Sequence, residues 1–367
     1  MYLQRLRILN YKNIEEADLT FSPKINCFIG NNGEGKTNLL DAVYYLSFCK
    51  SHTNSVDGQN VMHDRDFFML DGDYSLNDLS TNIYCGVKKR QKKQFKRDKK
   101  EYEKLSDHIG LLPLVLVSPS DEELILGGSE ERRKFIDGFI AQYDKLYLSR
   151  LLSYKTLLTQ RNSMIRNEIR DELLYETIEE QMATYGTYIF EQRTKFIADF
   201  LKHFQEFHQT VSLGKEKVDL IYQSQMQDQP SLLKLLKENR EKDFVVGYTT
   251  KGVHKDDLEM NMEELPIRKI GSQGQCKTYL IALKLAQFDF LKRLKNEKPI
   301  LLFDDIFDKL DTLRVNQIIQ LMKDNRFGQV FISDTNREHL SSLLKNMDCD
   351  YHLYGVENGH IELKENR

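Results

Sequence analysis

The chain has 367 residues, with 53 Lys or Arg against 56 Asp or Glu and a formal net charge of −3. This length allows two or more domains with a substantial core. The charge balance excludes a uniformly basic nucleic-acid-binding surface, so any basic surface must be local. The five cysteines form no C-x-x-C pair, the N-terminus lacks the apolar stretch of a signal peptide, and no run reaches the roughly 18–20 apolar residues of a membrane span. We therefore expect a cytoplasmic protein with reduced thiols and no membrane contact.

The amino-terminal part is predicted to be rich in β-structure. Apolar, β-prone runs predict strands at residues 3–9, 17–21, 25–29, 81–87 and 113–117. Residues 38–46 have the apolar spacing of a helix, which should run to about Cys49.

A glycine-rich loop separates the third of these strands from the helix. Residues 30–37 read Gly-Asn-Asn-Gly-Glu-Gly-Lys-Thr and match G-x-x-x-x-G-K-[ST] at every fixed position. Such glycines let backbone N–H groups wrap a polyphosphate, and the helix N-terminus adds partial positive charge. Lys36 would lie between the β- and γ-phosphates, and the Thr37 hydroxyl would ligate Mg²⁺; the alternative is a chance glycine-rich loop. The predicted phosphate-binding residues are Gly30, Asn31, Asn32, Gly33, Glu34, Gly35, Lys36 and Thr37.

A basic stretch follows the fourth strand. Residues 88–104 contain ten Lys or Arg and three acidic residues, and the alternation near residues 97–99 predicts a hairpin. Such a hairpin can lie along a DNA duplex and bind its backbone without sequence preference. The alternative is a solvated edge hairpin whose lysines prevent aggregation. The predicted DNA contacts are Lys92, Lys93, Lys96 and Arg97.

The character of the sequence changes after residue 118. Residues 139–185 contain no glycine or proline, and a Phe-rich pattern continues from residue 187 to 213. These features predict two or more long antiparallel helices, separated near Gly186 or earlier. The apolar residues of one helical stripe are Leu151, Tyr154, Leu158 and Ile165.

Mixed α/β character returns after residue 244. We therefore expect an α/β domain split into residues 1–118 and 245–367, with a helical domain inserted at residues 119–244. The other residues that an ATP site needs should lie in the second part of the split domain, residues 245–367.

Residues 299–305, Pro-Ile-Leu-Leu-Phe-Asp-Asp, predict an apolar strand that ends in two carboxylates. This is a Walker B pattern. Asp304 would hold Mg²⁺, which prefers hard oxygen ligands. Asp305 would orient and partly deprotonate the attacking water, so the predicted catalytic residues are Lys36, Asp304 and Asp305. The alternative is that the two aspartates only cap the next helix.

A second glycine-containing loop, residues 271–275, precedes an amphipathic helix predicted at residues 276–294. It is a further anion site at a helix start. Since one nucleotide does not need two such loops from one subunit, Ser272, Gly274 and Gln275 would cap the γ-phosphate that a second subunit holds. The alternative is a plain helix N-cap.

Together these motifs resemble the ATP-binding-cassette (ABC) heads of the SMC/Rad50 class, and within that class the RecF family. The resemblance covers nearly the whole chain. It rests on residues 9–14, residues 118–121 with 128–137, residues 252–258, the signature loop at 271–275, and residues 304–311, where Walker B is followed by a D-loop.

The resemblance implies an ABC-type P-loop ATPase head with an inserted helical arm, and ATP with Mg²⁺ as cofactors. It implies a protein that dimerises on ATP and binds double-stranded and gapped DNA near single-strand to double-strand junctions. Such a protein acts with RecO and RecR to load RecA in recombinational repair, replication restart and the SOS response to DNA damage. It also implies slow, DNA-stimulated ATP hydrolysis.

Departures from the wider class leave alternatives open. Asp305 stands where most cassette ATPases use glutamate, which suits slow hydrolysis, and residues 333–335 contain no histidine to sense the γ-phosphate, a task left to Asp334 or Thr335. Val253 and Lys255 replace a proline and an arginine of one family motif. Another SMC/Rad50-like P-loop ATPase and a largely non-catalytic ATP-binding scaffold are the competing hypotheses. The absence of an N-K-x-D motif argues against a GTPase.

Overall fold

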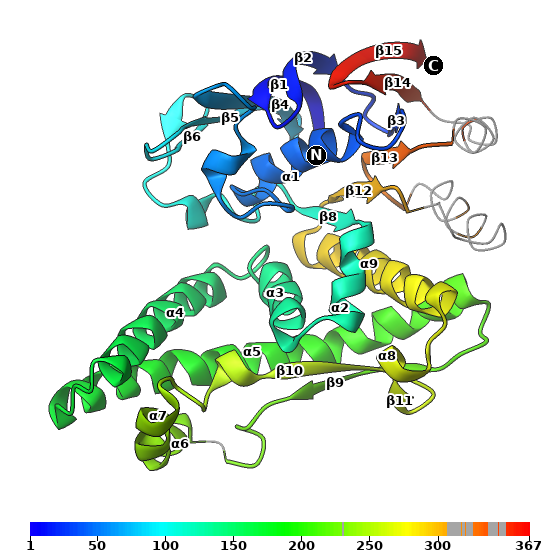
Figure 1. The fold of residues 1–367 in the computed structure, drawn as a ribbon. Coiled ribbons are helices and arrows are strands. Elements are labelled where there is room, and N and C mark those ends of the chain that lie inside the picture. Colours follow the sequence, from blue (N-terminus) through cyan, green and yellow to red (C-terminus); the bar gives the residue numbers. More distant parts are fainter. Residues whose placement is uncertain (230, 307–316, 318–319, 321–325, 337–343, 345–349) are drawn as a thin grey trace. The chain divides into compact units, whose positions relative to one another are not determined.

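The computed structural model describes residues 1–229, 231–306, 326–336 and 350–367, together with residues 317, 320 and 344 (Figure 1). The chain divides into two compact units. The first contains residues 1–121, 210–212 and 277–367, and the second contains residues 122–209 and 213–276.

The second unit extends past the boundary that the sequence predicts after residue 244. Residues 245–276 group with this unit because strand β10 (Asp257–Met262) pairs antiparallel with β9 (Val218–Gln223) in a three-stranded sheet. The pairing joins segments on both sides of the predicted boundary.

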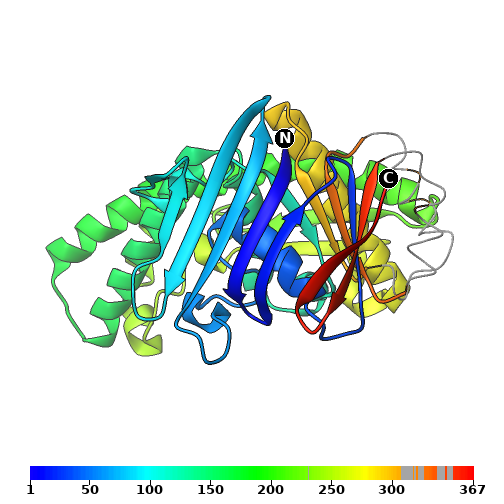
Figure 2. The ribbon, with the colours of Figure 1, turned by 90° about the horizontal axis from the view of Figure 1, so that it is seen from above.

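Two six-stranded sheets form the first unit. One has the strand order β2-β1-β4-β5-β6-β7 and is antiparallel; Figure 2 shows its long strands side by side in blue and cyan. The other has the order β15-β14-β3-β13-β12-β8 and is parallel except for β15. The strands are β1 (Tyr2–Tyr11), β2 (Ile14–Thr20), β3 (Ile25–Ile29), β4 (Phe67–Leu76), β5 (Leu79–Lys88), β6 (Gln94–Arg97), β7 (Lys100–Glu101), β8 (Leu114–Val117), β12 (Ile300–Asp304), β13 (Val330–Asp334), β14 (Tyr351–Glu357) and β15 (His360–Asn366).

Helix α1 (Lys36–Phe48) connects the two sheets through one hydrophobic core. It contacts β1 and β4 of the antiparallel sheet and β12 and β13 of the other. Its buried Leu39, Val43 and Leu46 pack in the same cluster as Leu6 of β1 and Leu302 of β12. The P-loop therefore leads into a helix that is fixed on both sides.

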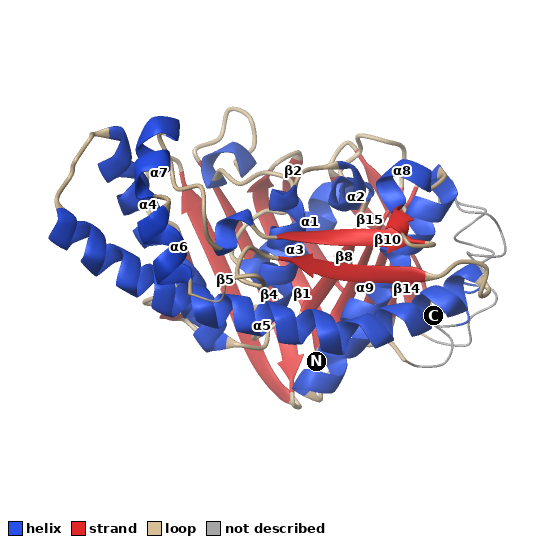
Figure 3. Cartoon of the chain, turned by 90° about the horizontal axis from the view of Figure 1, so that it is seen from below, coloured by secondary structure: helices blue, strands red, loops and turns tan. Residues whose placement is uncertain are grey.

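The second unit contains a pair of long helices, α4 (Lys145–Arg166) and α5 (Glu172–Ser212), visible in Figure 3. The predicted pair is present, and the chain breaks at residues 167–171, where Asp171 caps α5 by accepting a hydrogen bond from the Leu174 N–H. Gly186 lies inside α5. A Cβ there would come within 2.3 Å of the Leu232 side chain, so glycine permits a close approach rather than a break.

The remaining elements of this unit are short. They are α2 (Glu122–Leu126), α3 (Ser129–Ile140), α6 (Leu232–Glu238), α7 (Arg240–Val246), α8 (Ile267–Ile270) and β11 (Leu265–Pro266). Helix α9 (Gln273–Lys295) begins in the second unit and continues in the first.

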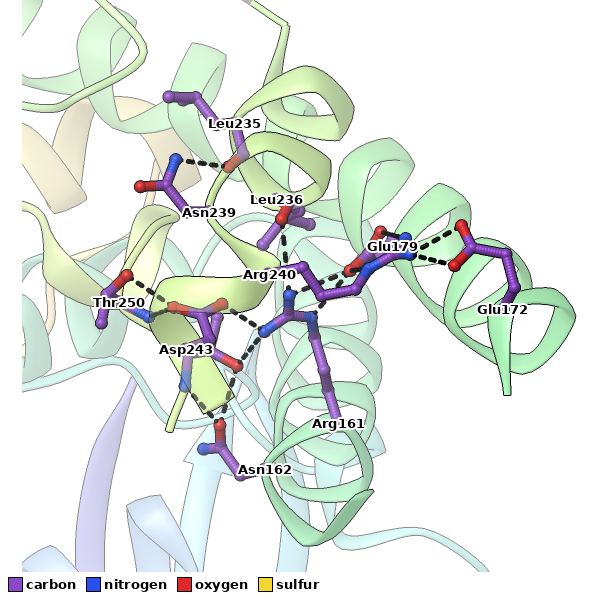
Figure 4. A network of polar contacts seen from close by, with 11 residues as sticks. Arg161, Asn162, Glu172, Glu179, Leu235, Leu236, Asn239, Arg240, Asp243 and Thr250 are labelled. Atoms are coloured by element: carbon purple, nitrogen blue, oxygen red, sulfur yellow. Dashed lines mark hydrogen bonds and ion pairs between the residues drawn. The ribbon is translucent and has the colours of Figure 1, made fainter. Parts of the chain in front are cut away.

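A buried ion network ties α7 to the long helices (Figure 4). The Arg161 guanidinium of α4 contacts Glu179 of α5 at 2.9 Å and Asp243 of α7 at 2.6 Å, and all three side chains are fully buried. Arg240 shares Glu179 at 2.7 Å. Buried charges of this kind are tolerated only when each is paired and hydrogen-bonded, so each charge in the network depends on the others for its partner.

Within the described part of the chain, no helix is long and apolar enough to cross a membrane.

Candidate functional site

The P-loop occupies the end of β3, between the strands β13 and β14. Gly33 and Gly35 adopt positive φ values of 86° and 116°, a region that other residues enter only with strain. Gly35 caps the start of α1. The loop thus has the backbone shape that directs successive N–H groups inward, at a helix N-terminus that favours anions.

The Lys36 ammonium lies folded onto this loop. It donates hydrogen bonds to the carbonyl oxygens of Gly30 at 2.7 Å and Asn31 at 2.8 Å. Burial lowers the pKa of Lys36, and the carboxylates of Asp305, Asp304 and Asp334 oppose that shift. Lys36 is therefore a buried cation that faces three acidic groups.

The Walker B carboxylate lies beside the P-loop threonine. The Thr37 hydroxyl donates to Asp304 Oδ1 at 3.0 Å. Burial raises the pKa of Asp304, and hydrogen bonds from Ser333 and Thr37 oppose the shift. A hydroxyl beside a buried carboxylate is the oxygen donor set that Mg²⁺ prefers, so the residues present fit this metal.

Asp305 follows at the end of β12 with a φ of +49°. This left-handed conformation is uncommon for a residue other than glycine, although aspartate tolerates it better than most. Strained backbone of this kind clusters at functional sites. The expected D-loop at residues 308–311 lies outside the described residues.

The C-terminal hairpin braces the P-loop from outside. Glu34 O accepts hydrogen bonds from Gly359 N–H at 2.8 Å and from the Asn13 side chain at 3.1 Å. The Glu34 carboxylate accepts a further bond from Asn358 N–H. Gly30 lies so close to this hairpin that a Cβ on it would come 2.2 Å from Val356 O.

The sequence reasoning missed a second polar cluster, around the α1 residue Asp41. Its buried carboxylate accepts hydrogen bonds from Tyr11 at 2.6 Å, Lys12 at 2.5 Å, Ser51 at 2.7 Å and the His52 N–H at 2.7 Å. The signal present in the sequence was one acidic residue within the otherwise apolar or aromatic run at residues 39–46.

The His52 side chain belongs to a cavity of about 260 Å³ that Thr37, Asp304, Ser118 and Ser120 also line. Burial lowers the pKa of His52, so its ring is neutral at pH 7. The cavity places hydroxyl and imidazole groups beside Thr37 and Asp304.

The signature loop forms a capping box at the start of α9. The Ser272 hydroxyl accepts from Gln275 N–H at 3.3 Å, and the Gln275 side chain accepts from Ser272 N–H at 2.9 Å. The N-cap reading of the sequence is therefore present in the structure. It leaves the Ser272 hydroxyl proton available to donate to an anion.

The predicted basic hairpin is present, with β6 and β7 joined by Asp98 and Lys99 at positive φ. Its four predicted DNA contacts differ in environment: Lys92 and Arg97 are exposed, and the Lys96 ammonium lies 5.5 Å from the Tyr84 ring.

The Lys93 ammonium is engaged inside the protein. It pairs with Asp57 at 2.9 Å and donates to the Cys49 carbonyl at 2.5 Å. Its side chain is 16% exposed. The sequence predicted all four residues as DNA contacts alike, because a sequence does not show which cations have partners inside the protein.

Comparison with known proteins agrees with this geometry. The chain matches the family model "RecF/RecN/SMC N terminal domain" over residues 2–362. It is 56% identical to the "DNA replication and repair protein RecF" of Phocaeicola vulgatus, over 100% of this chain and 99% of that protein. It is 54% identical to the protein of the same name from Bacteroides fragilis, over 100% of each.

Solved structures give the same result. A structure of "the recombination mediator protein RecF-ATP in RecFOR pathway" has a TM-score of 0.89 at 26% identity, covering 99% of this chain and 98% of that one. An Smc head bound to the C-winged helix domain of ScpA has a TM-score of 0.58 at 16% identity, covering 99% and 97%, which shows a shared fold. The predicted SMC-type ABC ATPase head is thus confirmed, and the chain belongs to the RecF family.

Proposed function

We propose that the chain is an ATP-dependent DNA-binding protein of recombinational repair and replication restart. It dimerises around ATP, binds gaps and single-strand to double-strand junctions, acts with RecR and RecO, and promotes RecA loading. Slow ATP hydrolysis serves as the switch. The observation that carries the proposal is the convergence of Lys36, Thr37 and Asp304 in a chain with full-length RecF relatives.

The proposed roles within the site follow from its geometry. The N–H groups of residues 30–37 bind the phosphates, and Lys36 exchanges its two loop carbonyls for phosphate oxygens. Thr37 and Asp304 hold Mg²⁺, which when bound neutralises developing phosphate charge. Asp305 orients the attacking water and accepts its proton.

The dimer is proposed from the signature loop. Ser272, Gly274 and Gln275 lie at a helix N-terminus with a hydroxyl proton free of the capping bonds. This loop would contact the γ-phosphate that the other subunit binds, so both subunits would contribute to each ATP site.

Measurement of mass by sedimentation, with and without ATP, tests this part. We expect wild type to dimerise with ATP, and both Lys36→Arg and Ser272→Arg to remain monomeric. Lys36→Arg should also lose nucleotide affinity, whereas Ser272→Arg should retain it. Variants that dimerise as well as wild type would refute the shared site.

DNA binding is proposed for the exposed face of the basic hairpin. Lys92, Lys96 and Arg97 would contact phosphates, each contributing roughly 0.9 to the salt slope of the binding constant. Lys93 is the matched control, because its ammonium is largely buried and paired with Asp57, whereas the Arg97 pair with Asp98 is exposed to solvent.

Duplex binding at several salt concentrations tests this assignment. We expect Lys92→Gln combined with Arg97→Gln to flatten the slope by roughly 2, and Lys93→Gln to leave it unchanged. An unaltered salt slope in the double variant would show that the hairpin does not bind the DNA backbone.

A further inference from the structure

Ser333 lies at the carboxyl end of β13, directly beside the Walker B aspartate. The two strands are parallel and in register there, with Asp304 opposite Ser333. The Ser333 side chain is fully buried. A buried hydroxyl is retained at low cost only when its hydrogen bonds are satisfied.

The hydroxyl of Ser333 makes two hydrogen bonds, one as donor and one as acceptor. It donates to Asp304 Oδ1 at 2.7 Å and accepts from the backbone N–H of Asp305 at 3.0 Å. The Ser333 carbonyl accepts from the same N–H at 3.2 Å. One residue thus holds the side chain of the first carboxylate and the backbone of the second.

Both bonds bear on geometry that the site needs. Asp304 Oδ1 already accepts from Thr37, so the two donors fix the rotation of this carboxylate. The bond to the Asp305 N–H fixes the backbone of Asp305, which has a left-handed φ. Groups that orient a metal ligand typically change metal affinity or activity by about 10–100-fold when removed.

We propose that Ser333 is a positioning residue that sets Mg²⁺ affinity and the placement of the Asp305 carboxylate through this single hydroxyl. The inference rests on the nucleotide and Mg²⁺ roles proposed above. It assigns a role to Ser333 of β13, a residue to which the sequence analysis gave none. The γ-phosphate sensor predicted at Asp334 or Thr335 is a separate role that this inference does not replace.

The test compares Ser333→Ala with Ser333→Thr, which keeps the hydroxyl. Ser47→Ala is the matched control, because Ser47 is also buried and donates to the Leu112 carbonyl at 2.5 Å, yet its partner lies outside the Walker B pair. The full chain is used throughout. Three quantities are measured: ATP affinity in EDTA, the Mg²⁺ concentration that gives half of the thermal shift with a slowly hydrolysed ATP analogue, and single-turnover hydrolysis.

We expect Ser333→Ala to bind ATP in EDTA within twofold of wild type. Its Mg²⁺ midpoint should rise about 10–100-fold and its hydrolysis should slow by a similar factor. Ser333→Thr should return the Mg²⁺ midpoint to within threefold of wild type, and Ser47→Ala should leave it unchanged. A purely structural role for Ser333 would lower thermal stability without moving this midpoint.

The failures are distinguishable. If wild type binds no ATP, the proposed function is refuted. If wild type binds ATP and shows a Mg²⁺-dependent shift that Ser333→Ala shares within twofold, the positioning role is refuted. If Ser333→Thr behaves like Ser333→Ala although both retain ATP binding, the hydroxyl is not the operative group, and the inference is overturned.

Discussion

The brace between the C-terminal hairpin and the P-loop predicts that Gly359→Ala weakens nucleotide binding. Gly359 has a φ of +79°, and a Cβ there would lie 2.1 Å from Asn13 O. The left-handed conformation costs an alanine about 1–2 kcal/mol. The clash requires a shift of about 1 Å against backbone, which breaks the bond from Gly359 N–H to Glu34 O, worth about 0.5–1.5 kcal/mol.

Gly247→Ala supplies the control for backbone strain. Gly247 has a similar φ of +86°, but a Cβ there meets nothing within 4 Å. Both variants should therefore lose about 1–2 kcal/mol of unfolding free energy from strain. Only Gly359→Ala should also displace the P-loop, at a further cost of about 1.4 kcal/mol, which corresponds to tenfold weaker binding.

The assay is titration of a fluorescent ATP analogue in EDTA, alongside urea unfolding of each variant. We expect the dissociation constant of Gly359→Ala to rise about tenfold and that of Gly247→Ala to stay within twofold of wild type. Equal dissociation constants for the two variants would show that the hairpin does not hold the loop.

Two further predictions concern the second unit. Arg161→Met removes the shared partner of two buried carboxylates (Figure 4), and we expect a loss of about 3–5 kcal/mol in urea unfolding; a loss below about 1 kcal/mol would contradict the network's role. Burial lowers the pKa of His254 to about 4, below the unfolded value of about 6.5. Between these two pH values the unfolded chain binds one more proton than the folded chain. The unfolding free energy should therefore fall by about 3 kcal/mol as the pH drops from about 6.5 to about 4. His254→Asn should flatten this pH slope, and the exposed His63→Gln should not; a slope unchanged by His254→Asn would refute the assignment.

The sequence predicted those parts of the site that depend on local pattern. Strand β3, the P-loop, α1 and the end of β12 follow from residues adjacent in the chain. The β9–β10 pair was missed because its two strands lie far apart in sequence. The hairpin β14–β15 was missed although its strands are adjacent in the chain and joined by Asn358-Gly359, a dipeptide that predicts a two-residue hairpin turn.

Two residues show why other features of the fold and the site could not be predicted from the sequence. The sequence predicts a helix break near Gly186 or earlier; the break lies earlier, at residues 167–171, and Gly186 lies inside α5 close to the Leu232 side chain. Ser333 carried no motif, and its role appears only when β13 lies beside β12. Partners across strands decide such roles, and a linear pattern does not contain them.

The position of β3 in its sheet has a consequence for synthesis. Its two neighbours, β13 and β14, come from residues 330–334 and 351–357, so the strand that carries the P-loop is among the first made and its flanks are among the last. A nascent or truncated chain would hold the complete P-loop sequence without the neighbours that shape it. Fragments ending before residue 330 should therefore be unable to compete with finished protein for nucleotide.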